Sequence, residues 1–398
     1  MTIKFPLATT SWDQNEYDAL QRVITSNMFS MGSEVKEFEK QFAKYFGSKY
    51  AVMVNSGSSA NLLMTGALFY TKNEKVRLRP GDEIIVPAVS WSTTYYPLSQ
   101  YGLVQKFVDI DLYTLNYDLS ALEDAITDQT RAIMIVNLLG NPNNFEKIKE
   151  LIGTRNILLL EDNCESMGAK FQNKYTGTFG IMGTFSSFFS HHISTMEGGI
   201  VVTDDEELYH IMLSMRSHGW TRNLPIENKV TGIKSDDAFE ESFNFVLPGY
   251  NLRPLEMSGA LGLEQLKKLP TLIEGRRDNA KSFQKKLRNH PIFFLQEEIG
   301  ESSWFGFSVV LRPNKNISRK RLISELNLNG FEVRPIVAGN FTNNPVMAHI
   351  PHRVHGKLEN ADYIDKNGLF IGNHHYKIDE AIDALAPVSY THLTLPTN

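Results

Sequence analysis

Short apolar runs alternate with helix-length segments in this sequence, and this alternation constrains the fold more than any other feature. The runs end in turn residues and are rich in β-branched and aliphatic side chains: residues 49–57, 82–90, 104–110, 131–140, 156–162 and 184–189. Residues 16–29 and 34–47 carry apolar side chains at helical spacing. Short strands joined by crossover segments predict an α/β fold with a mostly parallel sheet.

The pattern changes near Leu255. A long amphipathic stretch, residues 257–290, is followed by strand candidates at 305–313 and 330–339. We therefore expect a large α/β domain over residues 1–255 and a smaller α+β domain over 256–386. Residues 387–398 lack helical periodicity, and we interpret them as a foreign or frameshifted tail.

Charge and hydropathy limit the possible partners. The formal net charge is −5, and acidic and basic residues are mixed along the chain, so neither nucleic acid nor an anionic membrane is an expected partner. The N-terminus has no continuous apolar signal region, and no window approaches the ~18 apolar residues of a membrane span. A cytoplasmic enzyme acting on a small molecule fits this composition.

Cys164 is the single cysteine. One thiol excludes an internal disulfide, and it excludes an iron–sulfur cluster held by one chain because such clusters need several thiolates.

Polar or aromatic side chains follow four of the predicted strands. They are Gly57 with Ser58, Trp91, Asp162, and the pair His191 and His192. Because ligands of parallel sheets bind beyond the carboxyl ends of the strands, we expect these residues to meet.

Each feature has two interpretations. Gly57 and Ser58 precede a helix and could bind a phosphate or form a plain cap. Trp91 could stack on a planar cofactor or pack in the core. Asp162, after Glu161 and before Glu165, needs a cationic or donor partner, which a pyridinium nitrogen or an arginine could supply.

The histidine pair also has two interpretations. One ring could act in a site, or one could be buried in the core and the other solvated. We expect no metal site, because adjacent side chains of an extended chain point to opposite sides and no further ligand is spaced to complete one.

Together these features resemble a known pattern. Their order and spacing are similar to those of the fold-type I pyridoxal-phosphate enzymes, and in particular to the DegT/DnrJ/EryC1/StrS family of nucleotide-sugar aminotransferases and dehydratases. The resemblance covers roughly residues 5–385. It rests on GDEIIVPAVSW, LEDNCESMGA, GTFSSF, EGGIVVTDDEEL, RSHGWTRN and GYNLRPLEMSGALGLEQLKKL.

In this family a lysine lies five residues after the phosphate-binding serine and six before the acidic residue of the Glu-Gly-Gly loop. Counting forward from Ser186 and back from Glu197 both give His191, and no lysine occurs between Lys174 and Lys229. His192 is the weaker choice. A lysine would bind the cofactor covalently, which an imidazole cannot do. His191 instead implies a noncovalently held cofactor and a general base.

The resemblance therefore implies the dehydratase branch that leads to colitose, a sugar of the lipopolysaccharide O-antigen. It implies pyridoxal 5′-phosphate and pyridoxamine 5′-phosphate as cofactors, and L-glutamate and GDP-4-keto-6-deoxymannose as substrates. The products are ammonia and a 4-keto-3,6-dideoxy sugar. A neighbouring branch acts on CDP-sugars with an iron–sulfur cluster, for which one cysteine is not enough.

The resemblance also implies roles for single residues. Gly57, Ser58 and Ser186 bind the phosphate, Trp91 lies against the pyridine ring, Asp162 pairs with its N1, and Glu165 lies beside its hydroxyl. Asn251 reaches the phosphate from the second subunit, which implies a homodimer with shared active sites. Arg222, Glu332 and Arg334 are candidate substrate contacts, because a diphosphate favours arginine, or else members of surface or interdomain salt bridges. Ser190, where the aminotransferases usually have asparagine, is a candidate substrate contact that makes room either for the histidine or for a different sugar geometry.

Two other functions remain open from the sequence. One is a nucleotide-sugar aminotransferase whose lysine comes from elsewhere in the chain. The other is a catalytically silent protein that binds a sugar nucleotide.

Overall fold

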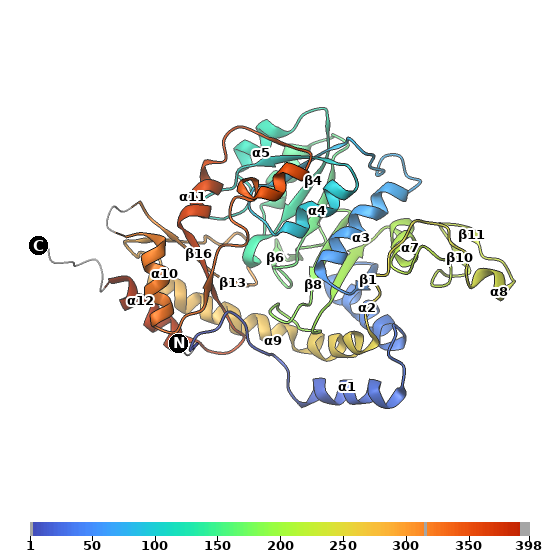
Figure 1. The fold of residues 1–398 in the computed structure, drawn as a ribbon, viewed down its shortest axis with the longest axis horizontal. Coiled ribbons are helices and arrows are strands. Elements are labelled where there is room, and N and C mark those ends of the chain that lie inside the picture. The colour runs from blue at the N-terminus through green and yellow to red at the C-terminus, as the bar shows by residue number, and fades with distance from the viewer. Residues whose placement is uncertain (1–2, 314–316, 391–398) are drawn as a thin grey trace, which may run out of the picture.

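The computed structural model describes residues 3–313 and 317–390, with the side chains of 386–390 left out. A mixed eight-stranded sheet forms its centre (Figure 1). In spatial order the strands are β1 (Tyr50–Val54), β9 (Gly199–Thr203), β8 (Met182–Ser186), β5 (Leu158–Asp162), β4 (Thr130–Val136), β2 (Glu83–Pro87), β3 (Val104–Val108) and β15 (His352–Val354). Only β9 runs against its neighbours, so the predicted mostly parallel α/β sheet is confirmed.

Helices cover both faces of this sheet. Apolar side chains alternate between the faces, as at Ile84 and Ile85 of β2, which belong to different buried clusters. One face packs against α3 (Gly57–Tyr70), α4 (Ser92–Gln100) and α7 (Glu206–Met215). The other face packs against α2 (Ser33–Phe46), α5 (Leu119–Ala125), α6 (Phe145–Ile152) and α9 (Glu256–Leu287). Helix α1 (Gln14–Ser26) lies along α9.

A second sheet, antiparallel throughout, lies beside the far end of α9 (Figure 1). Its strands are β12 (Phe293–Leu295), β13 (Gly306–Leu311), β16 (Gly368–Gly372) and β14 (Val333–Arg334), and its helices are α10 (Arg319–Leu328), α11 (Glu359–Asn367) and α12 (Asp379–Tyr390). The two sheets support a division after residue 255, which stays a prediction. Strand β15 crosses that division, because it pairs with β3 of the large sheet.

Smaller elements complete the chain. Strands β6 (Lys170–Phe171) and β7 (Lys174–Tyr175) form one hairpin. Strands β10 (Glu227–Asn228) and β11 (Gly232–Ile233), with helix α8 (Ala238–Glu241), project from the body (Figure 1). The 3₁₀ helices are η1 (Leu138–Gly140), η2 (Phe341–Asn343) and η3 (Pro345–His349).

Three expectations from the sequence differ from the structure. The strand expected over 184–189 ends at Ser186, because a turn closed by the His191 N–H and the Phe188 carbonyl follows it. The strand expected over 330–339 joins the small sheet at Val333 and Arg334 and forms an isolated bridge between Phe331 and Phe5; the next residue, Pro335, has no N–H to donate. The tail beyond residue 390 lies outside the described residues, while residues 387–390 continue α12.

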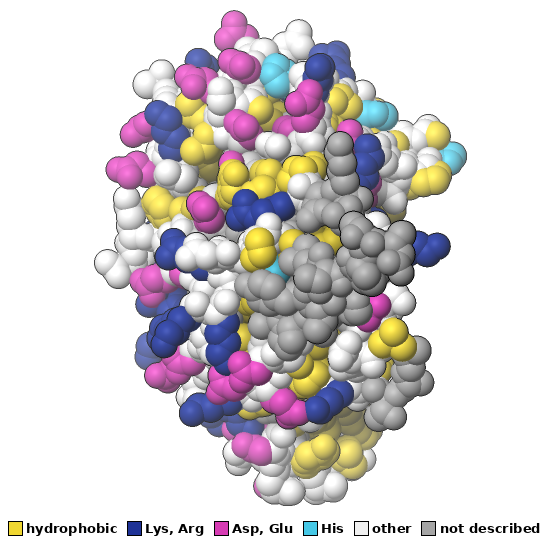
Figure 2. Space-filling model, turned by 90° about the vertical axis from the view of Figure 1, so that its left-hand side faces the viewer, with side chains coloured by type: hydrophobic (Ala, Val, Ile, Leu, Met, Phe, Trp, Pro, Cys, Tyr) yellow, Lys and Arg dark blue, Asp and Glu magenta, His cyan; other side chains and the backbone are white. Residues whose placement is uncertain are grey.

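The surface agrees with the mixed charge pattern. Figure 2 shows basic and acidic side chains interspersed on the face that it displays. Among the described residues, no helix combines the length and apolar character that a bilayer crossing requires.

Candidate active site

A cavity of about 460 Å³ lies at the carboxyl ends of β1, β2, β5 and β8. Nine of the residues singled out in the sequence line it: Gly57, Ser58, Trp91, Asp162, Glu165, Ser186, Ser190, His191 and Arg334. Phe305, Arg334, Pro335 and Val337 come from the C-terminal part of the chain, so both sheets contribute to the cavity. The strand-end residues predicted to meet therefore do so, with the exception of His192.

The N-terminus of α3 opens into this cavity. Ser56 caps the helix, and its hydroxyl accepts a hydrogen bond from the Ser59 N–H at 3.1 Å. The N–H groups of Gly57 and Ser58 precede the first intrahelical bond, which the Ala60 N–H donates to the Ser56 carbonyl. Free N–H groups and the helix dipole at this point suit an anion such as a phosphate.

Gly57 lies against the end of β8. A Cβ on this residue would meet the Ser186 Cβ at 2.8 Å and the Cys164 Sγ at 3.0 Å. The absence of a side chain therefore brings the helix start next to the Ser186 hydroxyl, the third predicted phosphate contact.

The Asp162 carboxylate is fixed at the end of β5. Its Oδ2 accepts hydrogen bonds from Asn61 Nδ2 and Thr94 Oγ1, each at 2.8 Å, and its Oδ1 accepts one from the Cys164 N–H at 3.2 Å. These three donors are neutral, and no cation among the described residues forms an ion pair with this carboxylate. A carboxylate held in this way suits a pyridinium nitrogen.

Glu161 and Glu165 serve different purposes. Glu161 is fully buried and accepts hydrogen bonds from the backbone N–H groups of Gly177, Phe179 and Gly180, away from the cavity. Glu165 lines the cavity and accepts one from the Leu139 N–H at 3.2 Å. Burial raises the pKa of Glu165 to about 7, although the nearby charge of Arg334 acts to lower it.

The two histidines point to different places. His191 lines the cavity, where its ring lies 5.0 Å from Phe305 and 5.9 Å from Phe188 between centroids. His192 is buried, and its Nε2 lies 3.1 Å from the Ser303 carbonyl oxygen. Burial, together with Arg334 and Arg276, lowers the pKa of His191 to about 3, so the imidazole is neutral at neutral pH.

The predicted aromatic residue lies at the rim. Trp91 directly precedes α4 and is 57% exposed, so its indole is available to a ligand rather than packed in the core. Ser190 lies at the same cavity, beside His191.

Three predicted residues do not line this cavity. Glu332 accepts a hydrogen bond from the Leu7 N–H at 2.9 Å and so holds the N-terminal segment. Arg222 lies over the Trp220 ring at 4.3 Å and contacts the Ser242 carbonyl. Asn251 is exposed and accepts a hydrogen bond from Arg253 Nε at 3.0 Å. Their assignment as ligands stays a prediction.

The sequence did not single out Asn61, Thr94 or Phe305. Asn61 lies one turn after the Ser-Gly-Ser segment, and Thr94 lies three residues after Trp91. Helical periodicity could have placed both on the faces that point toward Asp162. Phe305 comes from the far end of the chain, and the sequence carries no local signal for its place in the cavity.

The donor set fits a pyridoxal-phosphate cofactor. The cavity combines a helix N-terminus with a serine hydroxyl for a phosphate, and a neutral-donor-bound carboxylate for a ring nitrogen. It also contains a buried ring nitrogen, His191 Nδ1, without a hydrogen-bond partner among the described residues. In the described ranges no cluster of side chains is suited to hold a metal ion.

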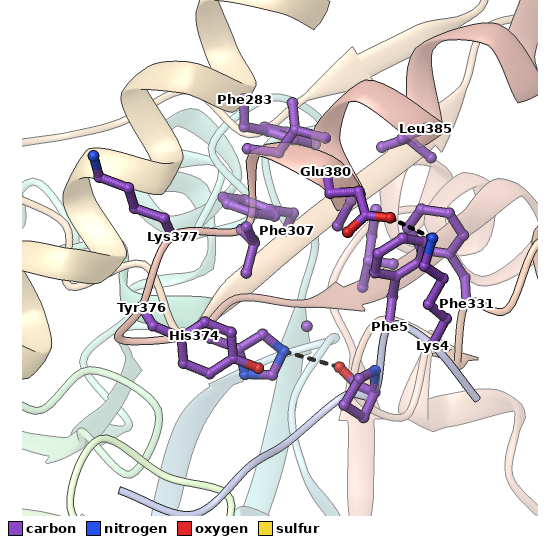
Figure 3. Close-up of a pocket in the computed structure, with 16 residues that line it drawn as sticks. Lys4, Phe5, Phe283, Phe307, Phe331, His374, Tyr376, Lys377, Glu380 and Leu385 are labelled. Carbon is purple, nitrogen blue, oxygen red and sulfur yellow. Dashed lines mark hydrogen bonds and ion pairs between the residues drawn. The ribbon is translucent and has the colours of Figure 1, made fainter. Parts of the chain in front are cut away.

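A second cavity, of about 180 Å³, is separate from this site (Figure 3). It lies where residues Lys4–Pro6 pack on the small sheet, and Phe283, Phe307 and Phe331 supply much of its wall. Two polar pairs lie in its wall: Lys4 with Glu380, and His374 Nε2 with the Pro6 carbonyl at 3.0 Å. None of the predicted site residues lies there.

Fold and site together define the class of fold-type I pyridoxal-phosphate enzymes. The chain belongs to the DegT/DnrJ/EryC1/StrS aminotransferase family, whose model matches residues 10–386.

Several relatives are similar over their whole length. GDP-4-keto-6-deoxy-D-mannose 3-dehydratase of Escherichia coli O55:H7 is 64% identical over 387 residues, which are 97% of this chain and 99% of the relative. The structure of the E. coli enzyme with bound hydrated PLP superimposes with a TM-score of 0.96 at 63% identity, over 98% of this chain and all of that one.

A second solved structure holds an adduct of cofactor and amino acid. It is a GDP-4-keto-6-deoxymannose-3-dehydratase with a trapped PLP–glutamate geminal diamine. Its TM-score is 0.95 at 63% identity, and the match covers 97% of this chain and all of that chain.

Proposed function

We propose that this chain removes the C3 hydroxyl of GDP-4-keto-6-deoxy-D-mannose in a glutamate-dependent reaction. The products are GDP-4-keto-3,6-dideoxy-D-mannose, 2-oxoglutarate and ammonia. The reaction balances without an outside reductant, because oxidation of the glutamate amino carbon supplies the two electrons that reduce C3. The oxygen lost from C3 as water balances the water that converts the glutamate amine to ammonia.

One observation carries this proposal. His191, and no lysine of the described residues, lines a cavity with the donors for pyridoxal phosphate. A neutral imidazole does not tether the cofactor, so the amine that the cofactor receives from glutamate remains free for the sugar ketone. Two GDP-4-keto-6-deoxy-D-mannose 3-dehydratases, 64% and 60% identical to this chain over nearly their whole length, support the same reaction.

The residues of the cavity hold the cofactor in this proposal. Gly57, Ser58 and Ser186 bind the phosphate, and Asp162 pairs with the ring nitrogen. The bound cofactor supplies an electron sink and an amine carrier. Trp91 covers the ring, and Glu165 lies beside its hydroxyl.

His191 moves the proton. Its imidazole is neutral at neutral pH, so a ring nitrogen lone pair is free to take up a proton during the elimination. The resulting buried imidazolium is a strong acid and returns that proton to the departing C3 oxygen. Ser190 and Arg334, at the same cavity, contact the sugar nucleotide, and Arg222 and Glu332 complete its binding.

The proposal includes a homodimer with shared active sites. The arm formed by residues 226–245 exposes five large apolar side chains: Ile226, Ile233, Phe239, Phe243 and Phe245. Asn251 follows the arm and is exposed. Docking of the arm on a second copy would bury these side chains and bring Asn251 to the phosphate of the neighbouring site.

A cytoplasmic location and a place in O-antigen sugar synthesis belong to the same proposal. The substrates that it names are a sugar nucleotide and a free amino acid.

Incubation of the protein with pyridoxal phosphate, L-glutamate and GDP-4-keto-6-deoxymannose tests the reaction. We expect equal amounts of ammonia, 2-oxoglutarate and the dideoxy product. A stable amino sugar would instead identify an aminotransferase, and no turnover would identify a binding protein. The same assay with the CDP-linked ketosugar tests the preference for guanine.

A further inference from the structure

The imidazole of His191 has no hydrogen bond that fixes its orientation at Nδ1. This atom is buried and has no hydrogen-bond partner among the described residues. A proton-transferring histidine ordinarily has one ring nitrogen bonded to a carboxylate or a carbonyl, which sets its tautomer and its ring plane. The orientation of this ring must therefore come from packing.

Two phenylalanines flank the ring. Phe188 contacts it edge to face at 5.9 Å, but Phe188 is 40% exposed and lies on the same turn as His191. Phe305 contacts it at 5.0 Å with an interplanar angle of 55°, and Phe305 is only 5% exposed. Of the two, Phe305 is the buried residue that packs against the His191 ring.

Phe305 is itself fixed through its backbone. Its N–H donates to the Leu139 carbonyl at 3.1 Å, and its carbonyl accepts a hydrogen bond from Arg276 Nη1 at 2.9 Å. The Leu139 N–H in turn donates to Glu165. The backbone of Phe305 is therefore hydrogen-bonded both to η1, which follows β4 of the large sheet, and to α9.

We propose that Phe305 is the positioning residue of His191. Its phenyl ring fixes the plane of the imidazole, as a hydrogen bond at Nδ1 otherwise would, and it keeps water away from Nδ1. The inference deepens the proposed function, because the catalytic role of His191 rests on that proposal. Phe305 also contacts the ring of His192 at 5.7 Å, so it packs against both histidines.

The electrostatic surroundings agree with this role. Arg334 and Arg276 are the cations that face His191, and His192 is its neighbour. The acidic groups at the same cavity are Asp162, Glu165 and Glu197. Burial is nevertheless the largest cause that lowers the His191 pKa, and Phe305 supplies part of that burial.

Titration of His191 by NMR tests the proposal without turnover. The full chain is labelled with ¹³C at histidine, the signal is assigned with His191→Asn, and the titration is run with and without pyridoxal phosphate. Phe305→Ala should raise the proton-binding constant of His191 about tenfold or more, because water reaches Nδ1. Phe305→Leu, which keeps apolar bulk without the ring face, should raise it about threefold.

Phe307→Ala is the matched control. Phe307 lies two residues further on, in β13, is 2% exposed and stacks on Phe283 at 4.0 Å, so its loss also opens a buried cavity. We expect the His191 titration to stay at the parent value in this variant. Equal shifts in the Phe305 and Phe307 variants would reduce the role of Phe305 to general packing.

A parent-like titration in Phe305→Ala overturns the proposal. Should that variant not fold, a parent-like titration in Phe305→Leu has the same consequence. The titration contains no substrate, so its outcome is independent of the dehydratase assay. Failure of the dehydratase assay would contradict the proposed function but not the positioning of the His191 ring by Phe305. In the active enzyme, we expect the acidic limb of the kcat profile of Phe305→Leu to move to higher pH while KM changes little.

Discussion

Two adjacent histidines in this chain have unlike surroundings. The turn after β8 directs His191 into the cavity and His192 toward the Ser303 carbonyl. Counting from Ser186 and Glu197 predicts His191 as the functional residue of the pair, and the cavity places His191 but not His192 beside the other predicted residues. The two imidazoles therefore differ in their surroundings because the backbone turn after β8 points them in different directions.

The substitution His191→Lys should exchange one chemistry for another. We expect the amine to bind pyridoxal phosphate covalently and the dehydratase rate to fall about 10²–10⁴-fold, the usual contribution of a general acid–base residue. Absorbance of the purified variant and the mass of the borohydride-reduced chain measure the covalent bond. His192→Asn is the control and should bind the cofactor as the parent does. Full dehydratase activity in His191→Lys would remove the proposed role of His191.

Glu165 should make stability depend on pH. Its pKa is raised from 4.5 to about 7 by burial, so the folded chain favours the protonated form, and this contribution is complete below pH 4.5 and lost as the pH rises through 7. The stability of the parent relative to Glu165→Gln should fall by about 1.4 kcal/mol between pH 6 and pH 8. Urea unfolding of both chains without added cofactor at the two pH values measures it. A constant difference would mean that Glu165 is ionised throughout.

Among the elements, the short η1 helix joins the two sheets at the cavity. Gly140 has a φ of 97°, and a Cβ there would meet the Trp304 N at 2.5 Å and the Phe305 N at 2.9 Å. The lack of a side chain at this position allows the segment before β13 to approach η1.

Gly140→Ala should therefore lower the free energy of unfolding by more than the strain of the left-handed backbone alone. We expect a loss of about 2–4 kcal/mol in the free energy of unfolding, from the left-handed backbone together with the displaced 304–305 segment. Gly81→Ala is the matched control, because Gly81 has a φ of 93° and nothing within 4 Å of its would-be Cβ. Denaturant unfolding of the two variants separates the cost of the left-handed backbone from the cost of displacing residues 304–305. Equal losses in the free energy of unfolding would show that the contact between Gly140 and this segment is unimportant.

The sequence predicts the elements that carry their own signal. Apolar strands with turn residues at their ends, such as 156–162, appear as strands within a few residues of the expected bounds. Strand β14 is shorter than expected and β15 was not foreseen, because its three exposed residues have no apolar pattern. The strand-end rule brings Gly57 and Asp162 together, whereas the contact of Phe305 with His191 depends on tertiary packing and has no local signature.

At the scale of the whole molecule, the projecting arm gathers five exposed apolar side chains on one segment, residues 226–245. We expect the double substitution Phe239→Asp and Phe243→Asp to convert a dimer to monomers and to reduce cofactor affinity, since Asn251 of the neighbour would be lost. Light scattering measures the mass, and dialysis against pyridoxal phosphate measures the affinity. Leu328→Asp on α10, 61% exposed, is the control. A parent that scatters as a monomer would contradict the dimer proposal.

The pairing of β15 with β3 has a consequence for how the chain is made. Residues 352–354 close the outer edge of a sheet whose other strands lie between residues 50 and 203. That edge stays unpaired until residues 352–354 have left the ribosome, so the growing chain exposes the edge of β3 while the roughly 150 residues after β9 are being made. Nascent chains stalled before this point should need chaperones, and those released after it should not.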